Sequence, residues 1–284
     1  MKFILSTILL ASSSVVFSQK CENCQDLYDA KEYEQVIENV AQTVEKADYK
    51  DLVLLAKSYQ NLGMKKDAIE AYNYILLNDE NNVDALVAVG ALFIDLKQYE
   101  NALFATERAL KFDEANKNAI YNISVIHLRQ NKYELFHETS DKQLDMNPLN
   151  KDFLYLKAIF YLEDKDYEKA SEYFDRILKL GPSGKDEPNY EFYYGYAAFK
   201  LNNLGLAKEK LMKAVEIQSE ELIEAYYFLA QVHVKLENKI EACEAYTKAI
   251  NLGDIALTKE ADAYCEGEKS KKSKFTERLV RISF

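Results

Sequence analysis

The chain has 284 residues, a formal net charge of −11, and only eight glycines and three prolines. Because so few residues break helices, the composition favours an all-helical fold, and the acidic balance opposes non-specific binding to nucleic acid. The length would suit two ordinary domains, but a stack of repeats can also reach this size as one continuous structure.

Residues 1–18 have the pattern of a secretory signal peptide. Lys2 supplies a short positive region, and the apolar stretch that follows it is too short to span a bilayer comfortably. We expect cleavage near Ser18/Gln19 and an extracytoplasmic mature protein, periplasmic or secreted. Retention of the segment as a membrane anchor is the alternative. The residues just before Cys21 do not form a lipoprotein signal.

The rest of the chain repeats one pattern with a period of about 34 residues. The clearest copy is residues 49–82, in which two short helical patterns flank the turn at residues 61–63. One position of the pattern is alanine in most copies, and successive copies place it at Ala68, Ala102, Phe136, Ala170, Ala207 and Ala242. A fixed period in this range is typical of a solenoid in which each unit is one supersecondary element.

Each copy tends to carry small residues at its eighth and twentieth positions and aromatic residues at its eleventh and twenty-fourth. This pattern resembles the tetratricopeptide repeat. Together with the signal-like residues 1–18, it resembles the exported bacterial type of that family. The resemblance implies an all-α, right-handed superhelical solenoid of about seven helix-turn-helix repeats over residues 19–256. We expect the units near residues 19–48, 49–82, 83–116, 117–150, 151–184, 188–222 and 223–256. A capping helix and a charged, apolar tail are expected over residues 257–284.

Two stretches depart from the regular pattern. The unit 117–150 has His127 where tyrosine is usual and Phe136 where alanine is usual. Residues 181–188 are rich in glycine and proline and add three residues to the period. We interpret them as a longer loop between repeats and a point of flexure, not as a domain boundary.

The four cysteines are Cys21, Cys24, Cys243 and Cys265. Outside the cytoplasm cysteines can pair, and two pairs near the ends would suit staples on a solenoid. For Cys21 and Cys24 we favour a local disulfide or free thiols, because no strand, following histidine or further metal ligands accompany them. For Cys243 and Cys265 a disulfide is one hypothesis, and two buried free thiols are the other.

No catalytic arrangement stands out among the remaining residues. The three histidines fit packing positions, and no nucleophile–base pair or phosphate-binding glycine loop is recognisable. We therefore expect a protein that is not an enzyme, with no cofactor, no metal site and no small-molecule substrate. A thiol-redox protein that uses Cys21 and Cys24 is the alternative from a different functional class.

In the tetratricopeptide family the first helix of each repeat lines a concave groove, so the resemblance implies a binding groove here. The corresponding positions in the copy 83–116 are the small residues Val87, Ala88 and Ala91. The expected groove residues in later copies are Tyr121, Asn122, Arg129, Tyr155, Ile159, Phe192, Tyr193, Tyr196, Tyr227 and Gln231. A patch rich in aromatic residues usually marks an interaction site. Packing of these residues against neighbouring repeats is the competing interpretation.

The sequence therefore predicts a non-catalytic scaffold that binds a peptide or a segment of another protein in the groove. An extended peptide or an amphipathic helix is the expected ligand. A cell-envelope assembly factor that uses the same groove is one alternative. Self-association into a homo-oligomer, through an apolar tail docked in a neighbour's groove, is another.

Overall fold

The computed structural model describes residues 23–42, 44–182, 189–217 and 221–265. These residues form fifteen α-helices and two short 3-10 helices, with no strand among them, which confirms the all-α prediction. The chain divides into two compact units, residues 1–133 and residues 134–284. The predicted signal peptide lies outside the described residues. No helix in the described ranges is long and apolar enough to cross a membrane.

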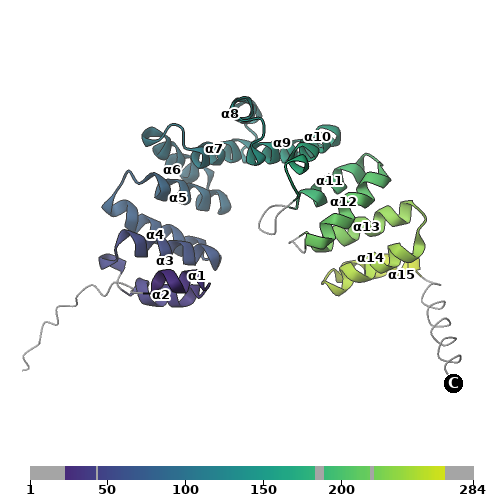
Figure 1. Ribbon diagram of the computed structural model, residues 1–284, viewed down its shortest axis with the longest axis horizontal. Coiled ribbons are helices and arrows are strands. Elements are labelled where there is room, and N and C mark those ends of the chain that lie inside the picture. Colours follow the sequence, from purple (N-terminus) through teal and green to yellow (C-terminus); the bar gives the residue numbers. More distant parts are fainter. Residues whose placement is uncertain (1–22, 43, 183–188, 218–220, 266–284) are drawn as a thin grey trace, which may run out of the picture. The chain divides into compact units, whose positions relative to one another are not determined.

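Unit 1 is a stack of two-helix hairpins (Figure 1). Helices α3 and α4 form one hairpin and α5 and α6 form the next, and each hairpin packs on its neighbour in the chain. The helices are α1 (Cys24–Asp29), α2 (Tyr33–Ala41), η1 (Val44–Lys46), α3 (Tyr49–Asn61), α4 (Lys65–Asn78), α5 (Val83–Asp95), α6 (Tyr99–Phe112) and α7 (Lys117–Arg129). The predicted units 49–82 and 83–116 each hold one hairpin.

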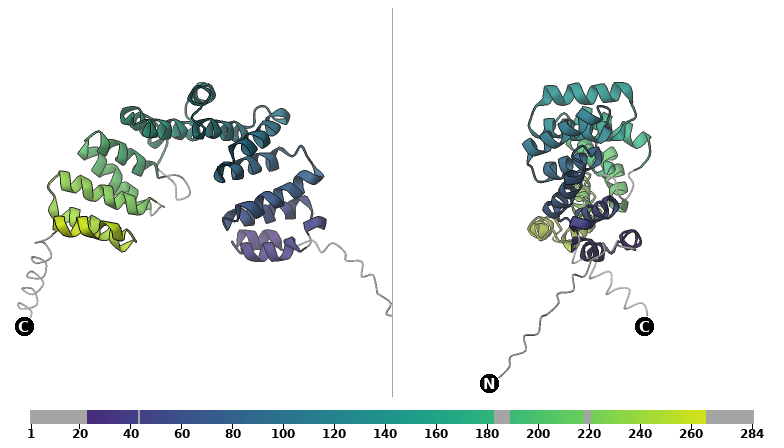
Figure 2. Two further views of the ribbon diagram at one scale, coloured as in Figure 1. Left: turned by 180° about the vertical axis from the view of Figure 1, so that it is seen from behind. Right: turned by 90° about the vertical axis from the view of Figure 1, so that its left-hand side faces the viewer.

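Unit 2 continues the same architecture, and Figure 2 shows its hairpins from two further sides. Its helices are α8 (Tyr133–Met146), α9 (Lys151–Glu163), α10 (Tyr167–Lys179), α11 (Tyr190–Lys200), α12 (Leu204–Ile217), α13 (Leu222–Lys235), α14 (Lys239–Asn251), η2 (Ile255–Leu257) and α15 (Thr258–Cys265). The division between the units falls between α7 and α8, inside the predicted unit 117–150. Of the loop interpreted as a point of flexure, residues 183–188 lie outside the described ranges.

Local signals in each copy set where its helices begin and turn. Side chains of Asp48, Asn82, Asn116, Asn150 and Asn189 accept hydrogen bonds from backbone N–H groups of the first turn of the following helix. Between the two helices of each hairpin, one residue adopts a positive φ. The residues are Lys31, Gly63, Lys97, Asn131, Lys165, Asn202 and Glu237. This left-handed residue ends the first helix and lets the chain reverse.

The recurring alanine position belongs to the buried core. Ala68, Ala102, Ala170, Ala207 and Ala242 are all fully buried. Small side chains there let the backbones come close enough for dense packing. The opposing helix can be equally constrained, since a Cβ built on Gly90 would stand 2.5 Å from Thr106 Oγ1. That hydroxyl is buried and donates to the Ala102 carbonyl oxygen at 2.7 Å.

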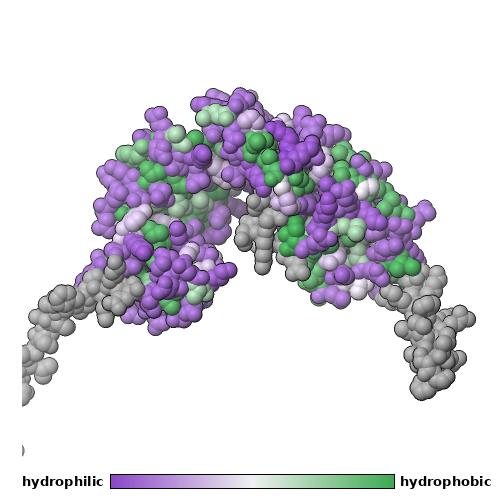
Figure 3. Space-filling view, in the orientation of Figure 1, coloured by the Kyte–Doolittle hydropathy of each residue, from purple (hydrophilic) through white to green (hydrophobic). Residues whose placement is uncertain are grey.

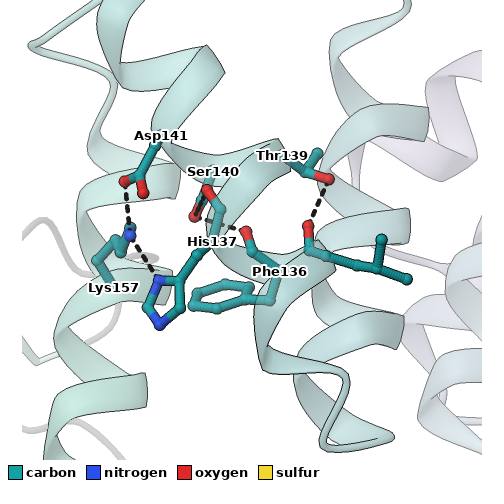
Figure 4. Close-up of polar contacts among 7 residues, drawn as sticks. Phe136, His137, Thr139, Ser140, Asp141 and Lys157 are labelled. Atoms are coloured by element: carbon teal, nitrogen blue, oxygen red, sulfur yellow. Dashed lines mark hydrogen bonds and ion pairs between the residues drawn. The ribbon is translucent and has the colours of Figure 1, made fainter.

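Phe136, which occupies the alanine position in α8, is also fully buried, and it packs on Phe160 of α9 with a ring separation of 5.5 Å. Figure 4 shows Lys157 near Phe136, together with the two polar partners of its ammonium group. The Lys157 ammonium contacts Asp141 Oδ1 at 2.6 Å and His137 Nδ1 at 2.7 Å, while the Lys157 side chain is only 3% exposed. Because the ammonium can only donate, His137 accepts through Nδ1 and is neutral.

The packing at Gly90 generates a stability prediction. Gly90→Ala should destabilise the protein by roughly 1–3 kcal/mol, because the new methyl displaces the buried Thr106 hydroxyl. Gly205→Ala in α12 is the matched control, since a Cβ there meets nothing within 4 Å. The control should be neutral or stabilising by about 0.5–1 kcal/mol. Urea unfolding followed by circular dichroism measures both, and equal effects would contradict the packing described for Gly90.

The cluster around His137 generates a pH prediction. Burial, and then the Lys157 charge, lower the pKa of His137, whereas Asp141 opposes the shift. The unfolded chain therefore takes up a proton on this histidine at a higher pH than the folded chain does. The stability held above the ordinary histidine pKa of about 6.5 should be lost as pH falls below it.

His137→Gln keeps an oxygen that can accept from Lys157 but cannot titrate in this range. We expect its unfolding free energy to fall less than that of the wild type between pH 7.5 and pH 5.5. The pKa of His233 is lowered as well, first by burial, so some pH dependence should remain. Parallel stability curves for His137→Gln and wild type would refute the assignment to His137.

Candidate functional site

Unit 1 contains a groove of about 460 Å³ whose walls come mainly from α3, α5 and α7. We call it the α3–α5–α7 groove. These are the first helices of three successive hairpins, so the groove lies on the face where the resemblance implied binding. Val87, Ala88 and Ala91 of α5 line the groove, as do Tyr121 and Asn122 of α7. Because the side chains of Val87, Ala88 and Ala91 are small, they leave space between the flanking helices α3 and α7.

Polar and aromatic side chains also line the α3–α5–α7 groove. Exposed Tyr49 and Lys57 belong to α3, Asp84 to the start of α5, and Asn118 to the first turn of α7. They place a cation, a carboxylate, a carboxamide and a phenol around a partly apolar groove. Ligand sites in proteins combine these features, an apolar lining and a small number of polar groups that orient the ligand.

Two hydrogen bonds fix the inner wall of the groove. Asn122 Nδ2 donates to the Val87 carbonyl oxygen at 3.0 Å and thereby ties α7 to α5. The Tyr72 hydroxyl donates to Gln60 Oε1 at 2.8 Å and ties α4 to α3. Burial raises the pKa of Tyr72 to about 12, so this hydroxyl stays protonated at neutral pH. The groove is therefore held open by contacts that need no ligand.

Of the expected groove residues in unit 1, Tyr121 and Asn122 line the α3–α5–α7 groove, whereas Arg129 is exposed at the end of α7 and is not part of the groove lining. The sequence interpretation gave most weight to aromatic residues after Lys117. The structure shows that the small residues of α5 create the volume. The missed participants are Tyr49, Asp84 and Asn118, which have no pattern of their own to identify them.

In unit 2 the expected aromatic residues come together, but they pack on one another. Tyr155 lies 6.1 Å from Tyr193, and the Tyr196 and Phe228 rings lie 4.9 Å apart. Tyr227 also packs edge-on against Phe228. We call the set Tyr155, Tyr193, Tyr196, Tyr227 and Phe228 the aromatic ladder. Each is half-buried, as is Ile159.

The polar tips and faces of the aromatic ladder have partners within the chain. The Tyr193 hydroxyl donates to Glu221 Oε1 at 3.0 Å, and burial followed by the neighbouring Tyr155 and Glu221 raises the Tyr193 pKa. The Lys200 ammonium lies 5.1 Å from the centre of the Tyr196 ring. The rings of the aromatic ladder are thus packed against one another and remain partly exposed to solvent.

Two further residues that the sequence placed in the groove, Phe192 and Gln231, make contacts within unit 2. Phe192 is only 7% exposed and belongs to the hydrophobic core of unit 2. Gln231 Nε2 donates to the Tyr246 hydroxyl at 2.7 Å and to Glu260 Oε1 at 2.6 Å. Tyr246 itself donates to Glu260 at 2.7 Å. Gln231 therefore joins α13 to α14 and α15.

The cysteines are placed as follows. Cys243 of α14 and Cys265 of α15 form a disulfide with an S–S distance of 2.01 Å and a Cα–Cα distance of 5.9 Å. Cys24 is fully buried in α1 and is disulfide-bonded. Cys21 lies outside the described residues. Within the described ranges, no group of histidine, cysteine, aspartate and glutamate side chains is arranged to hold a metal ion.

The surface of each unit is mixed in character. Hydrophilic residues cover most of the face of each unit that is visible in Figure 3, with hydrophobic side chains between them. Single exposed apolar residues are normal on soluble proteins and need no functional explanation.

Two family models match parts of the chain. The model described as "Anaphase-promoting complex, cyclosome, subunit 3" matches residues 95–177, and the model described as "Tetratricopeptide repeat" matches residues 223–252. Among curated proteins, no sequence matches this chain.

Solved structures of repeat proteins share the fold. A tetratricopeptide repeat protein from Parabacteroides merdae is 18% identical, with a TM-score of 0.61 over 86% of this chain and 95% of that one. The Cut9–Hcn1 structure of the APC/C has a TM-score of 0.66 at 13% identity, over 86% of this chain and 48% of that one. PilF of Pseudomonas aeruginosa has a TM-score of 0.59 at 14% identity, over 84% of this chain and 99% of that one. The helical hairpins of this period, the partial matches to the family models and these shared folds agree that the chain has a helical repeat fold like that of tetratricopeptide-repeat proteins.

Proposed function

We propose that this protein is a non-catalytic interaction scaffold that binds an extended segment of another protein in the α3–α5–α7 groove. The observation that carries the proposal is the groove of about 460 Å³ formed by the first helices of three successive hairpins in unit 1. A site built on rigid helices holds its binding groups in place without a cost of ordering loops.

The chemistry of the groove lining suits a peptide ligand. An extended main chain offers alternating N–H donors and C=O acceptors, and a carboxamide such as Asn118 can pair with both. Lys57 and Asp84 add one charge of each sign, so the groove favours no strongly charged ligand of a single sign. Val87, Ala88 and Ala91 leave room for apolar side chains. Binding in such a groove involves recognition with no bond chemistry.

The aromatic ladder of unit 2 supports a different role in this proposal. Its rings contact one another and the hydroxyl of Tyr193 is bonded to Glu221, so the ladder stiffens its face. Half-exposed ring edges at Tyr155 and Tyr196 leave it able to contribute an apolar surface. We assign the primary site to the α3–α5–α7 groove because an open volume is present there.

Export from the cytoplasm is the second part of the proposal. Disulfides persist in oxidising compartments, and the Cys243–Cys265 pair and Cys24 are disulfide-bonded. The signal-like pattern of residues 1–18 supports the same location. An assembly factor of the cell envelope would use the same groove, and the identity of a partner crosslinked in native cells distinguishes this role from a general scaffold.

The groove is tested by blocking it. Ala88→Arg places a long cation in the lining, and we expect peptides selected from a displayed library against the full chain to bind it at least about tenfold more weakly, a loss of about 1.4 kcal/mol. Fluorescence anisotropy measures the dissociation constants, and circular dichroism checks the fold.

Ala115→Arg is the matched control, because Ala115 is exposed in the same unit and does not line the groove. It should bind the selected peptides like the wild type. Unchanged binding by Ala88→Arg would refute the groove as the site. Loss of binding in Tyr196→Ala alone would place the site on the aromatic ladder instead.

Export is tested on protein from native cells, alkylated during lysis without a reductant. We expect a linked peptide pair containing Cys243 and Cys265 and a mature N-terminus at Gln19. Alkylated thiols at both positions, together with a retained Met1, would show that the chain stays in a reducing compartment.

A further inference from the structure

A second cavity, of about 450 Å³, lies at the C-terminal end of unit 2 between α14 and α15. We call it the end groove. Ile240, Cys243, Ile250, Ala261 and Cys265 give it a mainly apolar lining. Ile240 is 55% exposed although it is large and apolar. Because such groups are stabilised by removal from water, the end groove favours an apolar occupant.

The walls of the end groove are fixed with respect to each other. The Cys243–Cys265 disulfide joins α14 to α15 inside the groove lining. On the other side of α15, Glu260 accepts hydrogen bonds from Gln231 and Tyr246. These contacts hold α15 beside α14 whether or not the groove is filled, so the groove is a preformed site.

The repeat architecture indicates what is missing there. In unit 2 each first helix packs on the second helix that follows it, as α9 does on α10, α11 on α12 and α13 on α14. Helix α15 follows the second helix α14 and therefore takes the place of a first helix. Within the described residues, no later helix packs on α15. A helix laid against α14 and α15 would complete one more hairpin.

The chain itself supplies a segment of suitable chemistry. Residues 266–284 follow Cys265 directly and contain six basic and three acidic residues, in a chain whose net charge is −11. The lining of the end groove carries two acidic residues, Glu244 and Asp262, and one basic residue, Lys248, so its formal charge is negative. Opposite net charges favour docking of this segment over repulsion.

The apolar residues of this segment have helical spacing. Phe275, Leu279 and Ile282 stand at positions i, i+4 and i+7, so a helix would present them on one face. Nine residues separate Cys265 from Phe275, and an extended link of that length can span roughly 30 Å. The segment can therefore turn back to the groove at which it starts.

We propose that residues 275–284 fold back as a helix into the end groove of the same chain, with residues 266–274 as the link and with Phe275, Leu279 and Ile282 against Ile240 and Ile250. The segment then acts as the second helix of an additional hairpin and covers the apolar surface of α14 and α15. This inference is independent of the α3–α5–α7 groove.

The absence of tryptophan from the sequence gives a direct test. Phe275→Trp in the full chain introduces a single indole. We expect its emission to be shifted to shorter wavelength and its quenching by acrylamide to be severalfold weaker than for a free indole. Adding Ile240→Asp should move the emission to longer wavelength and restore quenching, because a carboxylate then lies in the docking surface.

Ile255→Asp is the matched control. Ile255 is 76% exposed and does not line the end groove, so this change should leave the indole emission unaltered. A solvent-exposed indole in the Phe275→Trp protein would overturn the proposal. A protected indole that becomes exposed on dilution, with a dimer seen by sedimentation, would also overturn it, because the segment would then occupy the groove of a second copy.

Discussion

The structure depends on the close approach of helices at one small residue in each repeat. Five alanines are buried at this position: Ala68, Ala102, Ala170, Ala207 and Ala242. On the opposing helix, the space at Gly90 admits no side chain larger than a hydrogen atom unless Thr106 moves. Since successive hairpins within each unit pack on one another, their first helices come side by side, as α5 and α7 do in unit 1 and α11 and α13 in unit 2. The α3–α5–α7 groove is a consequence of that order, because it forms where the aligned helices carry small side chains.

Helix α8 solves the same packing problem differently. Phe136 is too large for the close approach that alanine allows, and it is buried against Phe160 instead. Beside it, Lys157 is buried as a cation, which costs free energy unless partners compensate for the lost water. Asp141 and His137 provide those partners. The contact between α8 and α9 thus includes a titratable histidine that serves as a partner of the buried Lys157 ammonium.

Much of the fold could be predicted from the sequence because its causes are local and repeated. The 34-residue period, the alanine position and the departure at Phe136 were all visible there. The residues that line the groove were less predictable, because exposure at one position of a helix depends on what the next hairpin contributes. Phe192 and Gln231 occupy groove positions by register, but Phe192 is covered by core packing, and Gln231 is hydrogen-bonded to Tyr246 and Glu260. Likewise, Asp84 and Asn118 join the α3–α5–α7 groove only through the stacking of separate hairpins.

Equivalent positions therefore serve different purposes in the two units. In unit 1, Val87, Ala88 and Ala91 leave an open volume, and polar groups from α3 and α7 surround it. In unit 2, Tyr193 and Tyr196 fill the corresponding face with rings that contact one another, and a disulfide and the Glu260 hydrogen bonds fix the last helix. A helix position in this fold can either leave space for a ligand or use that space for packing. The size of the side chain makes the choice, so an open volume forms where the first helices carry small residues such as Ala88 and Ala91.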